Sequence, residues 1–291
     1  MNNNTKELGQ IIPLHYHFDM LCDKFRMAGF RTAIDLMVPT GGKVLELGGG
    51  TGVLSYFAAQ KAAKVYCVEL NPELAEKASK FLSMNTNGDR VEVINGDAFE
   101  YMPPEPVDVV ICEMLHVGLL CEKQLPVIDS FKKRYSEHFE NHPLPIFIPA
   151  AVVQAVQPVM QNFEFEGYRA PIILFQNPYS GAYPRTLELG NPVIYHTLQY
   201  ELPYDISCKW SGSLSITTDG TFNAIRILTK NILTIDPASM SAVEWYNQYL
   251  VLPLDNELKV SSGQTVQISF DYKAGDPLGA LRPCFLRPPA F

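Results

Sequence analysis

Membrane-spanning and secretory features are absent from the sequence. No run of about 18 uncharged apolar residues occurs in the 291 residues, so we expect no transmembrane helix. The first ten residues hold no basic region followed by an apolar run, so we expect no secretory signal. These two observations predict a soluble protein that does not act at a membrane.

Positive charge is also in short supply. Lys and Arg number 23 against 31 Asp and Glu, which gives a formal net charge of −8. Such a chain has no excess of cations with which to hold phosphate groups, so we expect no binding to nucleic acid. A partner that carries positive charge suits this composition better.

Cysteine is scarce and scattered. The six cysteines form no C-x-x-C pair and no Cys/His cluster at zinc-ligand spacing. They stand at Cys22, Cys67, Cys112, Cys121, Cys208 and Cys284. We interpret them as buried thiols, and we expect a protein of the reducing cytoplasm that binds no metal.

The composition is that of a well-packed globular protein. Apolar residues make up 47% of the chain and charged residues 19%, which excludes the disordered and collagen-like classes. A length of 291 residues allows two domains of about 100–200 residues each. Near Pro149 the pattern changes from alternating strand- and helix-length segments to short strand-like segments. We therefore predict domains at 1–149 and 150–291.

The first half alternates short apolar strands with helix-length segments. Strands are expected at 43–47, 64–70, 90–96 and 107–113, and helices at 53–63, 72–84 and 125–139. The strands are apolar on both faces, as in a parallel sheet covered by helices on both sides. This half is predicted to be an α/β domain with a Rossmann-like sheet.

The second half has the residue pattern of short strands. After residue 150, short alternating segments are separated by turn residues, and no long helical pattern occurs. Asp219-Gly220 and Ser262-Gly263 have the composition of hairpin turns. We predict a mostly β, barrel-like or sandwich domain that joins the first half without a flexible linker.

A glycine-rich turn follows the first predicted strand directly. Gly48, Gly50 and Gly52 stand between this strand and a helix, an arrangement in which backbone N–H groups face a ligand. Val53 occupies the position where the dinucleotide-binding fingerprint needs its third glycine. A site for a pyrophosphate is therefore disfavoured.

Acidic residues end the neighbouring strands. Glu69 is placed to accept hydrogen bonds from ribose hydroxyls, Asp97 from an adenine amino group, and Glu46 precedes the glycines. Each acid taken alone could be a solvated residue at a strand end. Together they favour a cationic nucleoside such as S-adenosylmethionine (SAM) and would repel NAD.

At this point the sequence resembles the class I SAM-dependent methyltransferases. Their first motif is similar to Val44-Leu45-Glu46-Leu47-Gly48-Gly49-Gly50-Thr51-Gly52, and the resemblance covers about residues 40 to 115. It implies a seven-stranded, mostly parallel sheet with SAM across the carboxyl ends of its strands.

Two further glutamates follow the fourth predicted strand. Glu113 and Glu122 enclose a loop that is otherwise uncharged. Two carboxylates at the mouth of a sheet could hold a planar guanidinium by paired, charge-assisted hydrogen bonds. The alternative is that Glu113 caps the next helix and Glu122 lies on its solvent-exposed side.

The whole chain resembles the protein arginine methyltransferase family, which carries two glutamates at this spacing. Residues 17–26, with Arg31, Ala33 and Ile34 after them, are similar to the helix before the family's first motif, and residues 243–250 to a late barrel strand. The resemblance implies that Arg26 pairs with the carboxylate of SAM and that His17 lines the cofactor pocket. It also implies that the glutamates hold the substrate's guanidinium, and it makes a homodimer possible.

The sequence departs from this family in three places. The loop of the two glutamates lacks the family's Met-Gly step and reads Leu115-His116-Val117-Gly118. No Thr-His-Trp occurs, and the region upstream of residue 243 reads Asp236-Pro-Ala-Ser-Met240. Residues 160–192, where the family's helical dimerisation arm would stand, show no helical period. These departures leave open a methyltransferase of a small metabolite or modified peptide, and a weakly catalytic SAM-binding interaction module. A nicotinamide oxidoreductase is disfavoured by Val53 and the acidic pocket.

Overall fold

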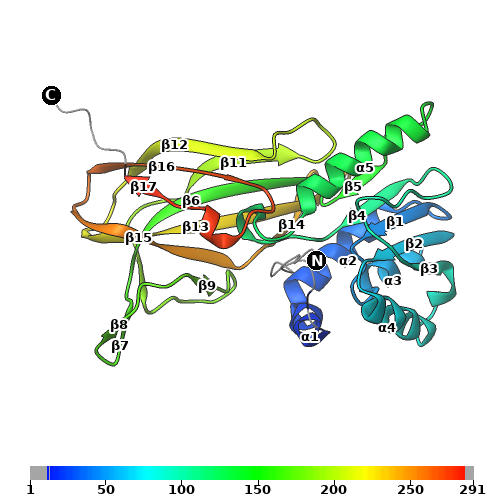
Figure 1. The fold of residues 1–291 in the computed structure, drawn as a ribbon, viewed down its shortest axis with the longest axis horizontal. Helices are drawn as coiled ribbons and strands as arrows, with labels where there is room; N and C mark the ends of the chain where they lie inside the picture. Colours follow the sequence, from blue (N-terminus) through cyan, green and yellow to red (C-terminus); the bar gives the residue numbers. More distant parts are fainter. Residues whose placement is uncertain (1–11, 13, 286–291) are drawn as a thin grey trace, which may run out of the picture.

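A five-stranded parallel sheet forms the first half of the computed structural model, which describes residues 12 and 14–285 (Figure 1). Its strands lie in the order β3-β2-β1-β4-β5. They are β1 (Lys43–Leu47), β2 (Lys64–Glu69), β3 (Val91–Asn95), β4 (Val109–Cys112) and β5 (Ile146–Ile148). The predicted Rossmann-like sheet is confirmed, but it holds five strands and not seven, because after β5 the chain enters a different sheet.

Two of the helices of this half begin at residues whose side chains cap them. They are α1 (Leu14–Cys22), α2 (Lys24–Met37), α3 (Val53–Ala59), α4 (Pro72–Ser83) and α5 (Gln124–His138), with single 3-10 turns at Gly88–Arg90 and Val117–Leu119. Asp23 accepts hydrogen bonds from the first amides of α2, and Asn71 does so for α4. In Figure 1, α3 and α4 lie on one side of the sheet and α5 on the other.

The second half is built from antiparallel strands in two main sheets. One has the order β10-β6-β13-β15-β9, with β11 added to β6 and β14 to β13, and the other has the order β12-β16-β17. These strands are β6 (Ala151–Gln161), β9 (Leu174–Gln176), β10 (Thr186–Glu188), β11 (Val193–Gln199), β12 (Ser207–Ser215), β13 (Gly220–Ile235), β14 (Ala242–Tyr246), β15 (Tyr249–Val260), β16 (Thr265–Lys273) and β17 (Cys284–Phe285), with a 3-10 turn at Leu278–Ala280. The predicted mostly β half is confirmed.

The two predicted hairpin turns prove to be links between sheets. Asp219-Gly220 connects β12 to β13 and Ser262-Gly263 connects β15 to β16, yet the strands on either side of each turn pair with other strands. The hairpin prediction was wrong because a turn sequence specifies the local bend and not the partner strand. The turns meet each other, since the backbone N–H of Ser262 donates to Asp219 Oδ1 at 2.7 Å.

The hydrophobic core of the first half extends into the second, and a separate buried cluster fills most of the β half. Phe30 and Ile34 of α2 belong to the same buried cluster as Leu233 of β13 and Trp245 of β14. A Cβ atom placed on Gly29 would lie 3.0 Å from Leu233 Cδ1, which shows how closely α2 approaches the β half. The predicted boundary at 149/150 falls between β5 and β6, which belong to different sheets. A division of the chain into separate domains there stays a prediction.

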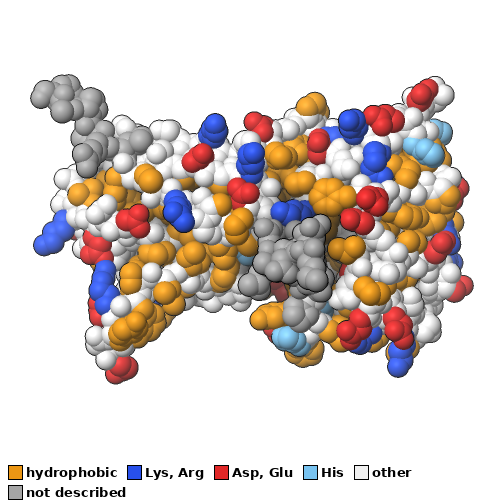
Figure 2. Space-filling view, in the orientation of Figure 1, with side chains coloured by type: hydrophobic (Ala, Val, Ile, Leu, Met, Phe, Trp, Pro, Cys, Tyr) orange, Lys and Arg blue, Asp and Glu red, His pale blue; other side chains and the backbone are white. Residues whose placement is uncertain are grey.

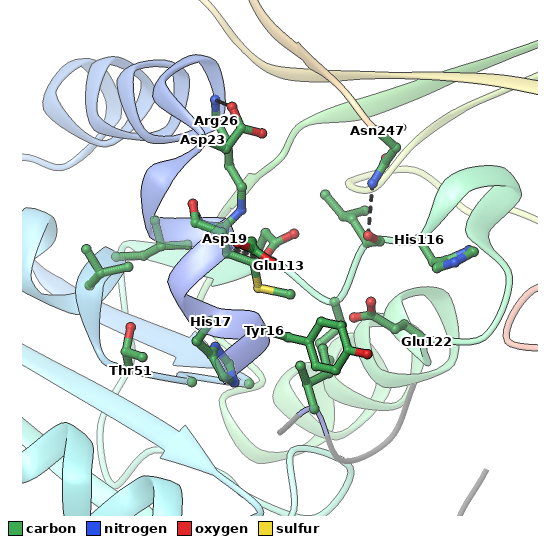
Figure 3. Close-up of a pocket in the computed structure, with 18 of the residues that line it drawn as sticks. Tyr16, His17, Asp19, Asp23, Arg26, Thr51, Glu113, His116, Glu122 and Asn247 are labelled. Carbon is green, nitrogen blue, oxygen red and sulfur yellow. Dashed lines mark hydrogen bonds and ion pairs between the residues drawn. The ribbon is translucent and has the colours of Figure 1, made fainter. Parts of the chain in front are cut away.

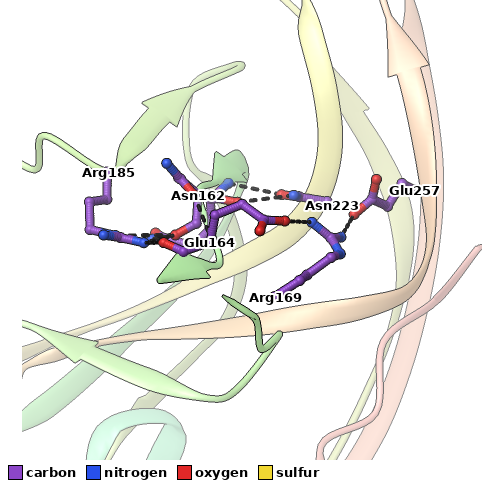
Figure 4. A network of polar contacts seen from close by, with 7 residues as sticks. Asn162, Glu164, Arg169, Arg185, Asn223 and Glu257 are labelled. Atoms are coloured by element: carbon purple, nitrogen blue, oxygen red, sulfur yellow. Dashed lines mark hydrogen bonds and ion pairs between the residues drawn. The ribbon is translucent and has the colours of Figure 1, made fainter. Parts of the chain in front are cut away.

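A short hairpin projects from the far end of the β half. It consists of β7 (Glu164–Phe165) and β8 (Tyr168–Arg169). Arg169 forms ion pairs with Glu164 and with Glu257 of β15, which fasten the hairpin to the sheet (Figure 4). Residues 160–192 form strands and loops without a helix, as their sequence predicts. Hydrophobic side chains gather over this end of the molecule (Figure 2).

Within the described ranges, no helix combines the length and the apolar character that crossing a membrane would require. The described cysteines form no disulfide. Of these, Cys67, Cys112 and Cys208 are buried, Cys121 is half-buried, and Cys22 and Cys284 are exposed. The interpretation of all six as buried thiols was therefore wrong for Cys22 and Cys284, which lie where the chain is at the surface.

Candidate active site

A cavity of about 980 Å³ lies at the carboxyl ends of the parallel strands, where the first half meets the second (Figure 3). Its wall includes α1 and the start of α2, the glycine turn, the loop after β4, the segment after β9, and residues 245–248. Nine of the ten predicted site residues line it: His17, Arg26, Glu46, Gly48, Gly50, Glu69, Asp97, Glu113 and Glu122. Gly52 is absent from this wall.

Both the backbone conformation and the close neighbours of the glycine turn favour glycine at Gly50 and Gly52. Gly50 and Gly52 have φ angles of +56° and +80°, a region that favours glycine. A Cβ on Gly50 would lie 3.1 Å from the His17 ring, and one on Gly52 would lie 3.0 Å from Leu82 of α4. Gly50 therefore brings backbone close to the cavity, whereas Gly52 lets the turn pack on α4.

Glu69 closes the glycine turn from the next strand. Its Oε2 accepts a hydrogen bond from the Gly50 N–H at 2.9 Å, and its Oε1 accepts one from the Asn71 N–H at 2.8 Å. Each carboxylate oxygen keeps a further lone pair, so ribose hydroxyls could still donate to it. Asp97 likewise accepts from the Phe99 N–H through Oδ1 at 2.8 Å, and no described group binds its Oδ2.

His17 offers the plainest sign that this part of the cavity is built for a ligand. Its Nε2 is buried and has no hydrogen-bond partner among the residues that the structure describes. Burial, followed by the charge of Arg26, lowers the pKa of the ring, so the neutral form is favoured. An unpaired buried polar atom beside a glycine turn and two strand-end acids fits a nucleoside such as that of SAM.

Glu46 binds the protein itself. Its Oε2 accepts hydrogen bonds from both the backbone N–H, at 2.9 Å, and the hydroxyl of Ser55 in α3. The side chain is buried, and burial raises its pKa to about 8. These contacts fasten β1 to α3, and a contact with a cofactor stays a prediction.

Glu113 forms a buried ion pair with Arg26. Arg26 Nη2 donates to Glu113 Oε2, and Arg26 is only 7% exposed. Burial disfavours the charged guanidinium, but the carboxylates of Glu113, Asp23 and Glu46 together outweigh it and raise the pKa of Arg26. If Arg26 pairs with the carboxylate of SAM as predicted, its guanidinium has to bind that carboxylate and Glu113 at the same time.

Glu122 faces the same cavity from the other end of the loop (Figure 3). No described group forms a hydrogen bond or ion pair with its carboxylate. Burial, and then the charge of Glu113, raises its pKa to about 8. The alternative, in which Glu113 caps the next helix and Glu122 lies on its solvent-exposed side, was wrong. The residue that precedes α5 is Lys123, and Glu122 points into the cavity.

Three residues that the sequence analysis missed hold the loop between the glutamates. Gln124 accepts from the Met114 N–H at 2.9 Å and donates to the Cys112 carbonyl at 2.6 Å. Asn247 donates to the Leu115 carbonyl at 2.9 Å (Figure 3), and Thr229 Oγ1 accepts from the Gly118 N–H at 2.7 Å. Asn247 and Thr229 come from the β half, so both halves build the site.

The tryptophan of the late barrel segment also reaches the first half. Trp245 Nε1 donates to Asp23 Oδ2 at 3.2 Å, and Asp23 is the residue that caps α2. Together with Asn247, Trp245 joins the 245–248 turn to the helix and loop that carry Arg26 and Glu113. These contacts are present in a chain that lacks the Thr-His-Trp sequence.

Comparisons with known proteins agree with this architecture. A family model described as a methyltransferase domain matches residues 44–133. An uncharacterized protein of Methanothermobacter thermautotrophicus is 32% identical over 91% of this chain and 95% of its own length. The arginine N(omega)-methyltransferase of Streptomyces achromogenes is 33% identical over 47% of this chain and 38% of its own length.

A solved structure shows the same fold across almost the whole chain. Protein arginine methyltransferase 10 of Arabidopsis thaliana superposes with a TM-score of 0.73 at 19% identity and covers 90% of this chain and 88% of its own. The parallel sheet with its glycine turn, the antiparallel second half and these matches lead to one assignment. Residues 44–133 hold a class I SAM-dependent methyltransferase domain, and the chain resembles the protein arginine methyltransferase family.

Proposed function

We propose that this protein transfers a methyl group from SAM to a nitrogen of a guanidinium-bearing acceptor. The observation that carries the proposal is the pair of carboxylates, Glu113 and Glu122, that face one cavity beside the glycine turn. A guanidinium presents N–H groups in a planar fork that fits carboxylate oxygens. Relatives named as arginine methyltransferases support the same acceptor, although their similarity covers only part of their length.

The proposed roles follow from the contacts of each side chain. Glu69 would hold the ribose of SAM, Asp97 its adenine, and Arg26 its carboxylate, with His17 and the glycine turn forming the wall. When bound, SAM supplies an electrophilic methyl group, and its sulfur leaves with the bonding electron pair as the acceptor nitrogen forms the new bond. In this proposal no metal takes part.

The two glutamates would align the acceptor nitrogen with the methyl carbon. Such alignment is worth about 7–11 kcal/mol in favourable intramolecular reactions. Glu113 shares one oxygen with Arg26 and keeps the other for the acceptor. Glu122 has both oxygens available, and it is the group to which the acceptor nitrogen's departing proton would go.

Transfer of labelled methyl groups from SAM to agmatine, L-arginine and an arginine-containing peptide tests the proposal. We expect Glu113→Gln and Glu122→Gln each to lower the rate by at least about 100-fold, because each removes a charge that holds the acceptor. Glu76→Gln is the matched control, since Glu76 is exposed on α4 outside the cavity.

Other results would favour the rival functions. Transfer to a nucleophile other than a guanidinium, unaffected by both variants, would contradict the guanidinium acceptor and favour another small metabolite. Stabilisation of the fold by SAM without any transfer would favour a binding module, whereas stabilisation by NAD would favour an oxidoreductase.

The proposal includes a cationic acceptor, a cytoplasmic location, and no nucleic-acid or membrane partner. On the face shown in Figure 2, acidic and basic side chains are interspersed, which supports the absence of a nucleic-acid surface there. A homodimer is also part of the proposal. Its support is the exposed apolar side chains of Phe165, Tyr168 and Ile172, in the region where the resembling family carries its dimerisation arm.

A further inference from the structure

We propose that the acceptor is a small, free guanidinium compound and not an arginine within a polypeptide. The inference rests on the proposed function and concerns the size of the molecule that enters the cavity. The feature that carries it is the segment 174–179, here called the strap, which lines the cavity at the junction of the two halves. An extended peptide would need this junction to be open.

The strap is fastened at its start to the β half. Phe175 pairs with Leu250 and Gln176 with Tyr249, so β9 is an edge strand of the larger sheet. The chain then turns at Asn177, whose Oδ1 accepts from the Tyr179 N–H at 2.9 Å. This turn directs Tyr179 towards α2.

Tyr179 connects the strap to α2 and to β14. Its ring is stacked on Phe25 of α2 with the centroids 3.8 Å apart and the planes 9° from parallel. Its hydroxyl accepts a hydrogen bond from the Tyr246 N–H at 3.1 Å. Rings at this separation are in van der Waals contact, so no peptide backbone can pass between the strap and α2.

Phe175 connects the strap to the loop that carries the two glutamates. Its ring meets the edge of His116 with the centroids 5.7 Å apart and the planes at 87°. His116 is held in turn by a contact of 3.1 Å between Nδ1 and the Val117 carbonyl. The strap therefore touches α2, β14 and the glutamate loop, and forms a continuous wall along one side of the cavity.

The size and charge of the cavity agree with a small cation. Its volume of about 980 Å³ has to hold both SAM and the acceptor, and cavities of about 300–1,000 Å³ usually hold one drug-sized ligand. Acids outnumber bases in the wall. The acids are Asp19, Asp23, Glu46, Glu69, Asp97, Glu113 and Glu122, and the bases are Lys24, Arg26 and Lys123.

Competition between acceptors tests the inference. The full-length protein is given SAM with agmatine, with L-arginine, and with a glycine-flanked peptide that contains one internal arginine. We expect kcat/KM for at least one small acceptor to exceed that for the peptide by about 100-fold or more, because the peptide backbone meets the strap.

Variants of Tyr179 test whether the strap causes the preference for small acceptors. Tyr179→Ala removes the stack and the bond to Tyr246, and we expect it to shift the ratio of peptide to agmatine methylation by about tenfold towards the peptide. Tyr179→Phe keeps the ring and should keep the wild-type ratio. Phe81→Ala is the matched control, because Phe81 is an exposed aromatic residue of α4 outside the cavity wall.

The outcomes separate this inference from the function on which it rests. Equal or better methylation of the peptide by the wild-type protein would overturn the inference and leave the guanidinium methyltransferase intact. Methylation of neither peptide nor small guanidines would overturn both. If Tyr179→Ala fails to fold, the wild-type ratio still decides, and an unchanged ratio in a folded Tyr179→Ala protein would show that the strap does not set it.

Discussion

At the scale of single residues, the charge balance between Arg26, Glu113 and Glu122 decides what the site can bind. Arg26 already neutralises Glu113, so the ionisation of Glu122 sets the net charge of this group of three side chains. Burial and the neighbouring carboxylate raise the pKa of Glu122 to about 8. Near neutral pH its protonated form is therefore favoured, and a bound cation shifts it towards the ionised form.

This balance predicts the pH dependence of activity. An acid is protonated below its pKa and ionised above it, and a guanidinium stays charged throughout the range. We therefore expect kcat/KM for the acceptor to rise with pH and to level off above about 8. Initial rates measured between pH 6 and pH 9, with SAM saturating, would show this limb. If kcat/KM of Glu122→Gln rose with pH in the same way, the rise would belong to another titrating group.

At the scale of elements, the loop between β4 and α5 is the part of the site that depends most on distant residues. Gln124 binds it from α5, Asn247 from the turn between β14 and β15, and Thr229 from β13. All three are buried. The positions of Glu113 and Glu122 therefore depend on hydrogen bonds that come from both halves of the chain.

Thr229 gives the clearest test of this dependence. Thr229→Val keeps the shape of the side chain but leaves the buried Gly118 N–H without an acceptor, which costs about 1–3 kcal/mol. We expect the free energy of unfolding to fall by this amount and kcat to fall with it. Thr229→Ser restores the acceptor and should recover kcat. Urea unfolding and methyl-transfer rates measure the two effects, and equal kcat in both variants would contradict this role.

Local patterns predict the parallel sheet well because its central strands β1, β2 and β4 are buried on both faces and α4 starts at a recognisable cap. The expected strand 43–47 and the α4 cap at Asn71 are both observed. The two glutamates were recognisable because the loop between them carries no other charge. Asn247 was not, because its partner Leu115 lies 132 positions away and nothing near Asn247 in the sequence indicates that contact.

The strands that are missing from the prediction have a physical explanation as well. The short strands β7 to β10 are largely exposed, so they lack the alternation of buried and exposed residues that marks a strand in a sequence. The β7–β8 hairpin is held by an ion pair with β15, β9 by pairing with β15 and a ring contact with the glutamate loop, and β10 by pairing with β6. Such contacts depend on the finished fold.

At the scale of the whole molecule, a buried cluster with residues from both halves connects them. Phe30 and Ile34 of α2 are fully buried beside Leu233 and Trp245 of the β half. Separation of the halves would expose these side chains to water, at about 1.5–3 kcal/mol for each. The halves are therefore expected to unfold together.

This arrangement predicts a single unfolding transition. Far-ultraviolet circular dichroism follows all the secondary structure. Tryptophan fluorescence follows Trp210 within the β half and Trp245 where the β half meets α2. We expect both signals to change at the same temperature and SAM to raise that temperature as one unit. Two separate midpoints would show that the shared core does not couple the halves.

Helix α1 has a consequence for the exchange of ligands. None of its nine residues is buried, yet Tyr16, His17 and Met20 line the cavity. An element with so little buried surface can open locally at a small fraction of the global free energy of unfolding. The rate at which ligands enter and leave is thus separable from the durability of the fold: a more heat-resistant variant of the core need not be a slower enzyme.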